Sequence, residues 1–298
     1  MSRILLTGAT GVVGRALLEK LDMPALLLLR NAKALAQELK GRPHIETAAY
    51  DLEDITPQTA HIIADFKPDI VIHTAWMGVE NDTRDFAPFV AFNLRSCLRL
   101  FEAAAPTCRH WVGFGSQAEY NSGIDEPIRE TAPTLPTGNY GIAKLAACHM
   151  LDALCRQQNI AFSWLRLFPC YSKHLRATYV LPYLIKTMRA GELPELRTPK
   201  AQWDYLHADD AARAIFTLAK KPQAADIYNL GHGQPVSVAH IAMTLAQLLD
   251  YPRTAELEAH IAANKTAATR RVSDPARLCQ ALGWKPQIDL RQGLKLCL

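Results

Sequence analysis

The stretch RILLTGATGVVG, residues 3–14, decides the fold of this 298-residue chain. Residues 4–7 form an apolar run typical of a buried strand, three glycines follow in the spacing G-x-x-G-x-x-G, and residues 15–21 have the composition of a helix. A strand, a glycine turn and a helix N-terminus make an anion site, because unpaired N–H groups and the helix dipole point at the same place. The stretch therefore predicts a loop that holds the phosphates of a dinucleotide, in preference to a turn without a ligand.

The composition excludes several other classes of protein. Hydrophobic residues make up 49% of the chain and charged residues 21%, and the net charge of +4 is not gathered in a basic run, so nucleic acid is not an expected partner. The longest apolar runs, such as residues 25–29, are too short to span a membrane, and no leader pattern stands at the N-terminus. The seven cysteines are scattered without a CxxC pair, which argues against disulfides and against a metal site. We expect a cytoplasmic protein.

Strand-like and helix-like segments alternate through the first half of the chain. The helical segments include residues 85–104 and 139–158, and the strand-like runs are short and apolar without alternation, as in a parallel sheet covered on both faces. This rhythm predicts an α/β fold, a Rossmann-type doubly wound parallel sheet that binds its ligand beyond the carboxyl ends of the strands. The runs expected to form strands are Ile4–Thr7, Ala25–Leu29, Asp69–His73, His110–Phe114 and Phe162–Leu167.

The pattern changes after Phe168, where prolines interrupt the chain. We expect a nucleotide-binding domain over residues 1–168, to which residues 204–230 return. Residues 169–203 and 231–298 are expected to form a smaller, partly interleaved α/β lobe that binds the substrate.

Capping residues predict two helices in this second half. Asp209 and Asp210 are expected to cap a helix over residues 211–220, and Ser237 a helix over residues 238–249.

Three residues of the first half could carry chemistry. Tyr140 and Lys144 are four residues apart, on one face of the expected helix. A free phenol titrates near pH 10, and a neighbouring ammonium stabilises the phenolate, so the pair could act as an acid/base. Ser116 ends an apolar strand at the edge where an open sheet binds its ligand, and it could hydrogen-bond a substrate carbonyl or hydroxyl beside Tyr140.

The glycine turn, Ser116, Tyr140 and Lys144 together resemble the short-chain dehydrogenase/reductase superfamily, and in particular its extended branch of nucleotide-sugar epimerases, dehydratases and reductases. The resemblance covers nearly the whole chain. It implies that Tyr140 is the acid/base, that Lys144 lowers the pKa of Tyr140 and binds the nicotinamide ribose, and that Ser116 polarises the reacting C–O group.

The resemblance also implies binding residues and an oligomeric state. Gln117 and Arg271 are expected to bind the substrate. The resemblance implies that this substrate is a small molecule, with a nucleotide sugar as the first candidate. A homodimer is expected through the helices that bear Asn93 and Tyr140. The residues implied to bind the cofactor are Gly8, Thr10, Gly11, Val12, Val13, Gly14, Arg30, Asn31, Asp51, Leu52, Thr74, Ala75, Trp76, Asn93, Tyr140 and Lys144.

The end of the second strand predicts the choice of cofactor. In NAD sites an acidic residue about twenty positions after the glycines accepts a hydrogen bond from the ribose 2′-OH, whereas an arginine there accommodates a 2′-phosphate. This chain has Arg30 and Asn31 at that position and no acid. A guanidinium can bind a phosphate through two hydrogen bonds, so we expect NADP(H) rather than NAD(H).

The residues after Ser116 narrow the reaction. Dehydratases of the extended branch typically carry an Asp-Glu pair there, because eliminating water needs an extra acid and base. This chain has Gln117 and Ala118, with Glu119 displaced by one position and expected to be a solvated or hydrogen-bonded loop residue. Residues 115–120 resemble those of NDP-4-keto-6-deoxyhexose 4-reductases, and with Arg30 they favour a reductase. An NAD-dependent epimerase and a non-catalytic NADP-binding sensor or scaffold are the alternatives.

Two departures from the family pattern concern the substrate. Pro169 stands where an asparagine commonly contacts the sugar diphosphate, and Trp203 stands where an arginine is frequent. Arg176, Arg270 and Arg271 are the remaining candidates for binding phosphate groups.

Overall fold

The computed structural model describes residues 2–298 except 32–34, 52–54, 81, 122 and 124–126. Its main feature is a seven-stranded sheet in the order β10-β6-β5-β4-β1-β2-β3, in which every neighbouring pair is parallel. The expected doubly wound α/β fold is confirmed. The strands are β1 Ile4–Thr7, β2 Ala25–Leu29, β3 Ile45–Ala49, β4 Ile70–His73, β5 His110–Ser116, β6 Ala161–Leu167 and β10 Ile227–Leu230.

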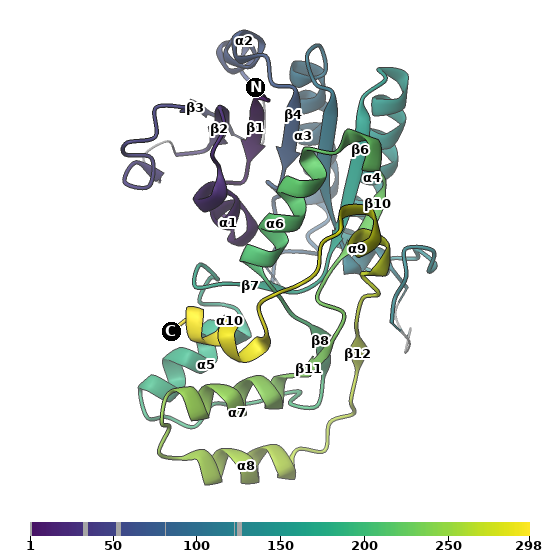
Figure 1. Ribbon diagram of the computed structural model, residues 1–298. Coiled ribbons are helices and arrows are strands. Elements are labelled where there is room, and N and C mark those ends of the chain that lie inside the picture. Colours follow the sequence, from purple (N-terminus) through teal and green to yellow (C-terminus); the bar gives the residue numbers. More distant parts are fainter. Residues whose placement is uncertain (1, 32–34, 52–54, 81, 122, 124–126) are drawn as a thin grey trace.

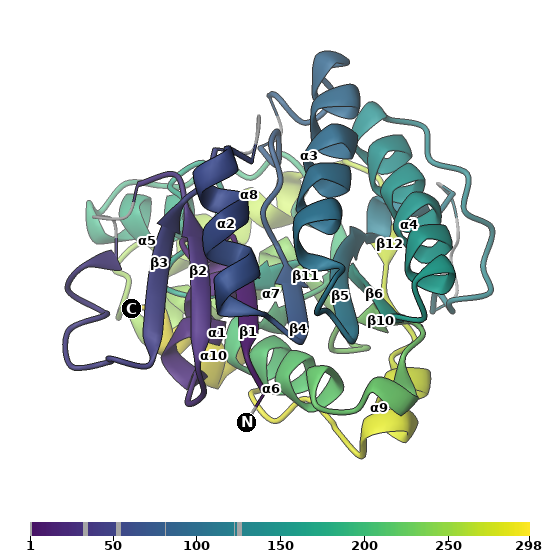
Figure 2. The same cartoon turned by 90° about the horizontal axis from the view of Figure 1, so that it is seen from above.

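Helices cover both faces of this sheet (Figures 1 and 2). Helices α1 (Val12–Lys20) and α6 (Ala208–Ala219) lie on one face, and α2 (Pro57–Phe66), α3 (Pro88–Ala104) and α4 (Asn139–Gln157) lie on the other. Each face has its own buried apolar cluster. Strands buried on both sides need side chains that are apolar throughout, which is why β1 and β2 could be recognised as unbroken apolar runs.

The chain order of the strands creates a switch point. The chain passes from β1 through α1 to β2 on one side, and β4 pairs with the other side of β1. The strand order therefore runs away from β1 in opposite directions, through β2 and β3 on one side and through β4 and β5 on the other. Such a reversal opens a crevice at the carboxyl ends of β1 and β4.

A smaller lobe lies beyond these strand ends (Figure 1). Strand β8 (Gln202–Asp204) pairs antiparallel with β11 (Pro235–Ser237) and parallel with β12 (Arg270–Arg271), while β7 (Cys170–Tyr171) pairs with β9 (Leu206–His207). The lobe thus combines segments from both sides of β10, and the boundaries expected for the two domains stay a prediction. The remaining helices are α5 Val180–Arg189, α7 Val238–Leu248, α8 Thr254–Ala263, α9 Ala276–Leu282, α10 Leu290–Leu296 and the single turns η2 Gln117–Glu119 and η3 Pro222–Ala224.

Asp204 joins these segments. Its carboxylate is fully buried and accepts hydrogen bonds from the backbone N–H groups of His232 (2.6 Å), Gly233 (3.0 Å) and Ser273 (3.0 Å), and from the Ser273 hydroxyl. One side chain therefore ties three stretches of the lobe that are far apart in the sequence.

Two helix starts differ from the expectations. Helix α3 begins at Pro88 and not at Asp85, whose carboxylate accepts a hydrogen bond from the backbone N–H of Tyr140 instead (3.0 Å). Helix α6 begins at Ala208, capped by the imidazole of His207, so Asp209 and Asp210 lie in its first turn and not at its cap. The expected cap at Ser237 is confirmed, because its hydroxyl accepts from the His240 N–H (3.0 Å). Every helix among the described residues is too short or too polar to cross a membrane.

Candidate active site

The glycine turn forms a tight cradle between β1 and α1. Gly8 has a φ of 74°, in the left-handed region that glycine tolerates, and its carbonyl accepts from the Gly11 N–H (2.9 Å). A Cβ on Gly14 would lie 2.0 Å from the same carbonyl oxygen, so only glycine allows α1 to approach β1 this closely. Helix α1 starts behind Gly11 with no side chain capping it. Its first N–H groups and its dipole are therefore available to a pyrophosphate, and a dinucleotide fits this turn.

A cleft of about 930 Å³ extends from this turn over the carboxyl ends of the sheet and under the lobe. Its wall combines the ends of β2, β4 and β5, the start of α4, and the segment 167–181 of the lobe. The expected site residues that line it are Gly8, Thr10, Gly11, Val12, Val13, Gly14, Arg30, Asn31, Thr74, Ala75, Trp76, Ser116, Gln117, Tyr140 and Lys144.

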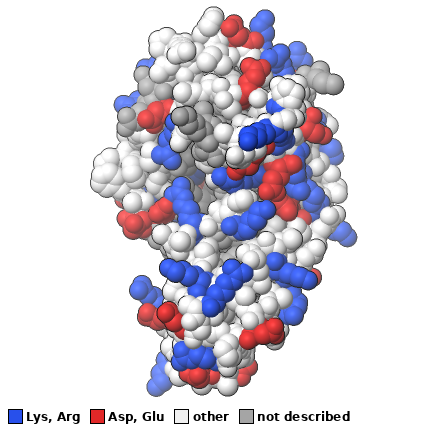
Figure 3. Space-filling view, turned by 90° about the vertical axis from the view of Figure 1, so that its left-hand side faces the viewer, with Lys and Arg blue, Asp and Glu red and all other residues white. Residues whose placement is uncertain are grey.

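The charges on this wall all have one sign. Arg15, Arg30, Arg84, Lys144 and Arg176 line the cleft, and no described lining residue is an aspartate or a glutamate. Figure 3 shows one face of the molecule with a hollow at mid-height and lysine and arginine side chains on both sides of it. Arg15 is paired with Glu38 and Arg176 with Glu80, both outside the described lining of the cleft. The lining itself is positively charged, and it therefore favours an anionic ligand.

Two expected cofactor-binding residues, Asp51 and Asn93, are not among the described residues that line the cleft. Asp51 is exposed beyond the end of β3, and Leu52 lies outside the described residues. Asn93 is buried in α3, where its side-chain amide accepts from the Met77 N–H (2.9 Å) and donates to the carbonyls of Met77 (3.0 Å) and Phe89 (2.8 Å). Asn93 therefore holds the chain just after Trp76 and contacts the site only through that segment.

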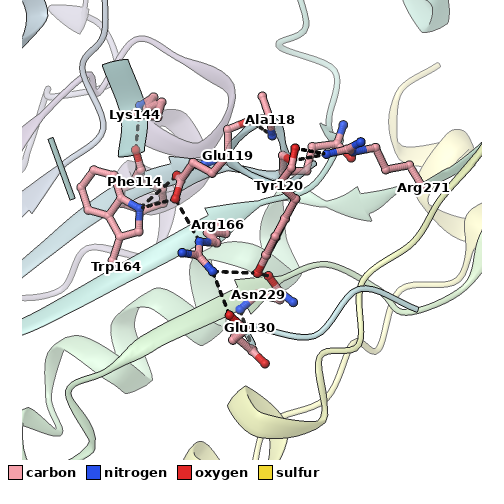
Figure 4. Close-up of polar contacts among 12 residues, drawn as sticks. Phe114, Ala118, Glu119, Tyr120, Glu130, Lys144, Trp164, Arg166, Asn229 and Arg271 are labelled. Carbon is pink, nitrogen blue, oxygen red and sulfur yellow. Dashed lines mark hydrogen bonds and ion pairs between the residues drawn. The ribbon is translucent and has the colours of Figure 1, made fainter. Parts of the chain in front are cut away.

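Arg271 was expected to bind the substrate, but its guanidinium is engaged elsewhere. It donates to the backbone carbonyls of Gln117 (2.6 Å), Tyr120 (3.1 Å) and Asn121 (3.2 Å). These carbonyls belong to η2 and the turn after it, where the last carbonyl oxygens of a helical turn have no N–H partner within the turn and need another donor. Arg271 thus stabilises the turn behind Gln117 (Figure 4). It is not among the described residues that line the cleft.

Lys144 is held between the sheet and an indole ring. Its ammonium donates to the Phe114 carbonyl (2.7 Å) and lies 3.6 Å from the ring centroid of Trp76. The side chain is 4% exposed, and this burial lowers the pKa of Lys144 to about 7. An aromatic ring face attracts a cation, so Trp76 favours the charged form of Lys144, which burial disfavours.

Tyr140 lies beside Lys144 at the start of α4. Burial raises the pKa of Tyr140 to about 12, while the positive charge of Arg84 and a hydrogen bond with Ser116 lower it. Ser116 and Tyr140 both line the cleft, so the two expected catalytic residues face the same space. The ammonium of Lys144 is 5.9 Å from the ring centroid of Tyr140.

Ser116 is fixed by a buried carboxylate. Glu119 is fully buried, and its carboxylate accepts from the Ser116 N–H (2.8 Å), the Trp164 indole N–H (3.1 Å) and the Arg166 Nε (2.9 Å) (Figure 4). The Ser116 hydroxyl in turn accepts from the Ala118 N–H (3.1 Å), which closes a capping box. The expectation of a hydrogen-bonded residue at Glu119 is met, and that of a solvated one is wrong, because β6 places Trp164 and Arg166 against it.

The network continues to the edge strand of the sheet. Arg166 also donates to the Tyr120 hydroxyl (3.0 Å), and Tyr120 donates to the side-chain oxygen of Asn229 in β10 (2.6 Å). The position of Ser116 therefore depends on three neighbouring strands.

Sequence reasoning missed several residues of the cleft. Arg15 directly follows the last glycine of the turn, so its position was a usable signal. Arg84 follows β4 at the ligand-binding edge of the sheet, where a cation could also have been noted. His174 and Tyr179 lie on the lobe, and no motif in the sequence pointed to them.

The fold and the cleft define an enzyme of the NAD(P)-dependent short-chain dehydrogenase/reductase class. Residues 4–231 match the model of the NAD dependent epimerase/dehydratase family. The chain belongs to this family.

Individual relatives are distant, but the similarity covers nearly the whole chain. The chain is 24% identical to dTDP-glucose 4,6-dehydratase 1 of Escherichia coli over 98% of its own length and 91% of the relative's. It is 25% identical to putative GDP-L-fucose synthase 2 of Oryza sativa, over 99% and 85%. Among solved structures, a UDP-glucuronic acid 4-epimerase of Bacillus cereus in complex with UDP-glucuronic acid and NAD superposes with a TM-score of 0.81 at 19% identity, over 99% and 97%.

Proposed function

We propose that this protein is an NADP-dependent oxidoreductase that reduces a keto group of a sugar nucleotide, in the manner of an NDP-4-keto-6-deoxyhexose 4-reductase. The observation that carries the proposal is the convergence of Ser116, Tyr140 and Lys144 in a cleft whose described charged residues are all basic. Both the nucleotide cofactor and a nucleoside diphosphate sugar are polyanions, so this wall suits both.

The proposed chemistry divides between the cofactor and three side chains. A bound nicotinamide nucleotide supplies the hydride for the carbonyl carbon. Ser116 donates a hydrogen bond to the carbonyl oxygen, and Tyr140 transfers its phenolic proton to that oxygen, so the C=O bond becomes CH–OH. Lys144 stabilises the phenolate that remains, and the phenol regains a proton from solvent before the next turnover.

The wall around the reacting group favours reduction over dehydration. Eliminating water from a sugar needs a further acid and base next to the carbonyl, and no described carboxylate lines the cleft. Gln117 lies there instead, and its side-chain oxygen is buried without a hydrogen-bond partner among the described residues. A substrate hydroxyl that donates to this oxygen would satisfy it, so Gln117 is proposed to orient the sugar.

Arg30 supports the choice of NADP. It directly follows β2, lines the cleft and is exposed, and it can therefore reach a 2′-phosphate on the adenosine ribose. We expect NADPH to bind at least tenfold more tightly than NADH, and Arg30→Asp to reverse this order. Fluorescence titration of both cofactors tests the choice. Equal or tighter binding of NADH by the unaltered protein would refute NADP specificity while leaving the reductase proposal standing.

The catalytic proposal is tested with purified protein, NADPH and a panel of NDP-4-keto-6-deoxyhexoses. Oxidation of NADPH at 340 nm with at least one of them is expected. Tyr140→Phe should lower kcat by about 10²- to 10⁴-fold, the usual contribution of a general acid. Tyr183→Phe, a change on the outer surface of α5, is the matched control and should keep full activity. A Tyr140→Phe variant as active as the parent would remove Tyr140 from the chemistry.

A nucleotide-sugar epimerase is the second candidate, favoured by the similarity to structures of 4-epimerases in complex with NAD. An epimerase retains NAD and interconverts two sugars without net oxidation. Purified protein that carries NAD and equilibrates UDP-glucose with UDP-galactose, without consuming NADPH, would favour this candidate over the reductase. Binding of NADP(H) with no turnover of any sugar would leave the non-catalytic sensor.

We also propose a homodimer through α3 and α4. The two helices pack against each other, and Phe86, just before α3, and Ile142 in α4 are 56% and 44% exposed. Light scattering should give twice the chain mass, and Ile142→Lys should reduce it towards the monomer. A monomeric parent protein would exclude the dimer.

A further inference from the structure

A second cation lies over the ring of Tyr140. The guanidinium carbon of Arg84 is 4.5 Å from the ring centroid, whereas the ammonium of Lys144 is 5.9 Å from the same point. Arg84 comes from the segment after β4, and Lys144 comes from α4, so the two cations approach the ring from different elements. Both line the cleft.

Contacts with the start of α4 fix the position of Arg84. The carboxylate of its neighbour Asp85 accepts from the Tyr140 N–H (3.0 Å), and the Asp85 carbonyl accepts from the Asn139 side chain (2.7 Å). Gly138 permits this approach, because a Cβ there would lie 2.6 Å from the Asp85 carboxylate. The backbone N–H of Arg84 donates to the Glu80 carbonyl (2.7 Å). Arg84 is thus anchored next to the residue that it covers.

The nearby carboxylates are engaged with other groups. Glu80 forms an ion pair with Arg176 of the lobe, and Asp85 accepts from the N-terminus of α4. Within the described ranges of the chain, no carboxylate lies at ion-pair distance from Arg84. The positive charge of Arg84 is therefore directed at the ring of Tyr140 and at the cleft.

Other groups around Tyr140 act in both directions. Lys144 lies on the same helix, Asp85 faces the helix start, Ser116 and Glu119 come from β5 and η2, and Tyr179 comes from the lobe. After burial, which raises the pKa of Tyr140, Arg84 has the largest effect and lowers it, Ser116 lowers it further, and Tyr179 and Glu119 raise it.

We infer that Arg84 is a second cation of the acid/base centre, which acts through Tyr140 by stabilising its phenolate form alongside Lys144. The negative charge of a phenolate spreads into the ring, so a cation over the ring face attracts the phenolate more strongly than the phenol. This assignment rests on the proposed acid/base role of Tyr140. It makes Arg84 a positioning residue, because it acts on the group that transfers the proton.

The first test measures the titration of residue 140 and does not depend on activity. 3-Fluorotyrosine placed at position 140 has a more acidic phenol, and ¹⁹F NMR follows its ionisation in the full-length protein. Arg84→Gln should move the midpoint upward by about one to two pH units, as expected for a charge lost near 4.5 Å in a partly buried site. Arg84→Lys should restore part of the shift. Arg99→Gln removes an exposed arginine of α3 and should leave the midpoint unchanged.

The second test uses the pH profile of the reverse reaction, in which the phenolate accepts the proton of the sugar alcohol. In Arg84→Gln the apparent pKa of the acidic limb of this profile should rise by the same one to two pH units as the NMR midpoint, and kcat at pH 8 should fall about tenfold or more. An unchanged NMR midpoint and an unmoved limb in folded Arg84→Gln and Arg84→Lys proteins would overturn the inference. Lack of turnover by the parent protein would refute the proposed function, while the NMR titration would still decide the role of Arg84.

Discussion

Removing the carboxylate of Glu119 should destabilise the protein far more than removing any exposed carboxylate. Glu119 is fully buried, and the Arg166 side chain opposite it is only 6% exposed. Glu119→Ala would leave the guanidinium without its counter-ion in a site from which water is excluded, and would also remove the acceptor for Ser116 and Trp164. Breaking one partner of a buried ion pair costs about 3–5 kcal/mol. We expect the free energy of unfolding to fall by about that amount.

The assay is equilibrium unfolding in urea followed by far-UV circular dichroism, because Trp164 lies in the network and would distort a fluorescence signal. The control is Glu102→Ala, which breaks an exposed pair with Arg99 and should cost less than about 1 kcal/mol. A paired replacement, Glu119→Leu with Arg166→Met, removes both charges and should recover most of the loss. The reasoning fails if Glu119→Ala unfolds within about 1 kcal/mol of the parent, or if the paired variant is no more stable than the single one.

Two further predictions concern the nucleotide turn and a buried histidine. Gly14→Ala should lower cofactor affinity more than tenfold and the free energy of unfolding by about 1–3 kcal/mol, because the added Cβ would lie 2.0 Å from the Gly8 carbonyl oxygen. Gly11→Ala is the comparison, and its Cβ would lie 3.3 Å from the same oxygen. It should lower both quantities less, as measured by cofactor titration and urea unfolding. Burial lowers the pKa of His73 to about 3, so the unfolded chain binds a proton near pH 6.5 that the folded protein refuses, and stability is lost as pH falls from about 6.5 to 3. In urea titrations at a series of pH values, His73→Gln should flatten the pH dependence of the free energy of unfolding by up to about 1.4 kcal/mol per pH unit. The same replacement at the exposed His61 is the control and should leave the dependence unchanged. An unchanged slope in the His73→Gln protein would exclude His73 as the source of the dependence.

The elements that the sequence predicted well are those whose signal is local. Strands β1 and β2 are unbroken apolar runs because they are buried on both faces, and the glycine turn follows from close backbone approaches within seven residues. Ser116 and Tyr140 could be found because a strand end and a helix face place them predictably at the same edge of the sheet.

The remainder depends on contacts between distant segments. Arg271 is 154 residues from Gln117, and nothing in the local pattern indicates that its guanidinium stabilises that turn instead of facing the cleft. Arg84 lies over Tyr140 in a segment that Asp85 joins to the start of α4, 55 residues further along the chain. Glu119 can be buried because Arg166 in β6 pairs with its carboxylate. The sequence around Glu119, one position away from the Asp-Glu pair of dehydratases, does not indicate that Arg166 is its partner.

The three stretches joined by Asp204 have a consequence for how the molecule can be divided. The edge strand β10 of the main sheet lies in the sequence between Asp204 and Ser273, which hydrogen-bond to each other across the lobe. A cut that removes the lobe would therefore remove β10 or leave β8 without β12. Neither half is a transferable module, and a chimera that exchanges the lobe between relatives must exchange the edge of the nucleotide-binding sheet with it. Changes of substrate in this scaffold are thus expected to arise through substitutions within the cleft, and not by recombination of whole lobes.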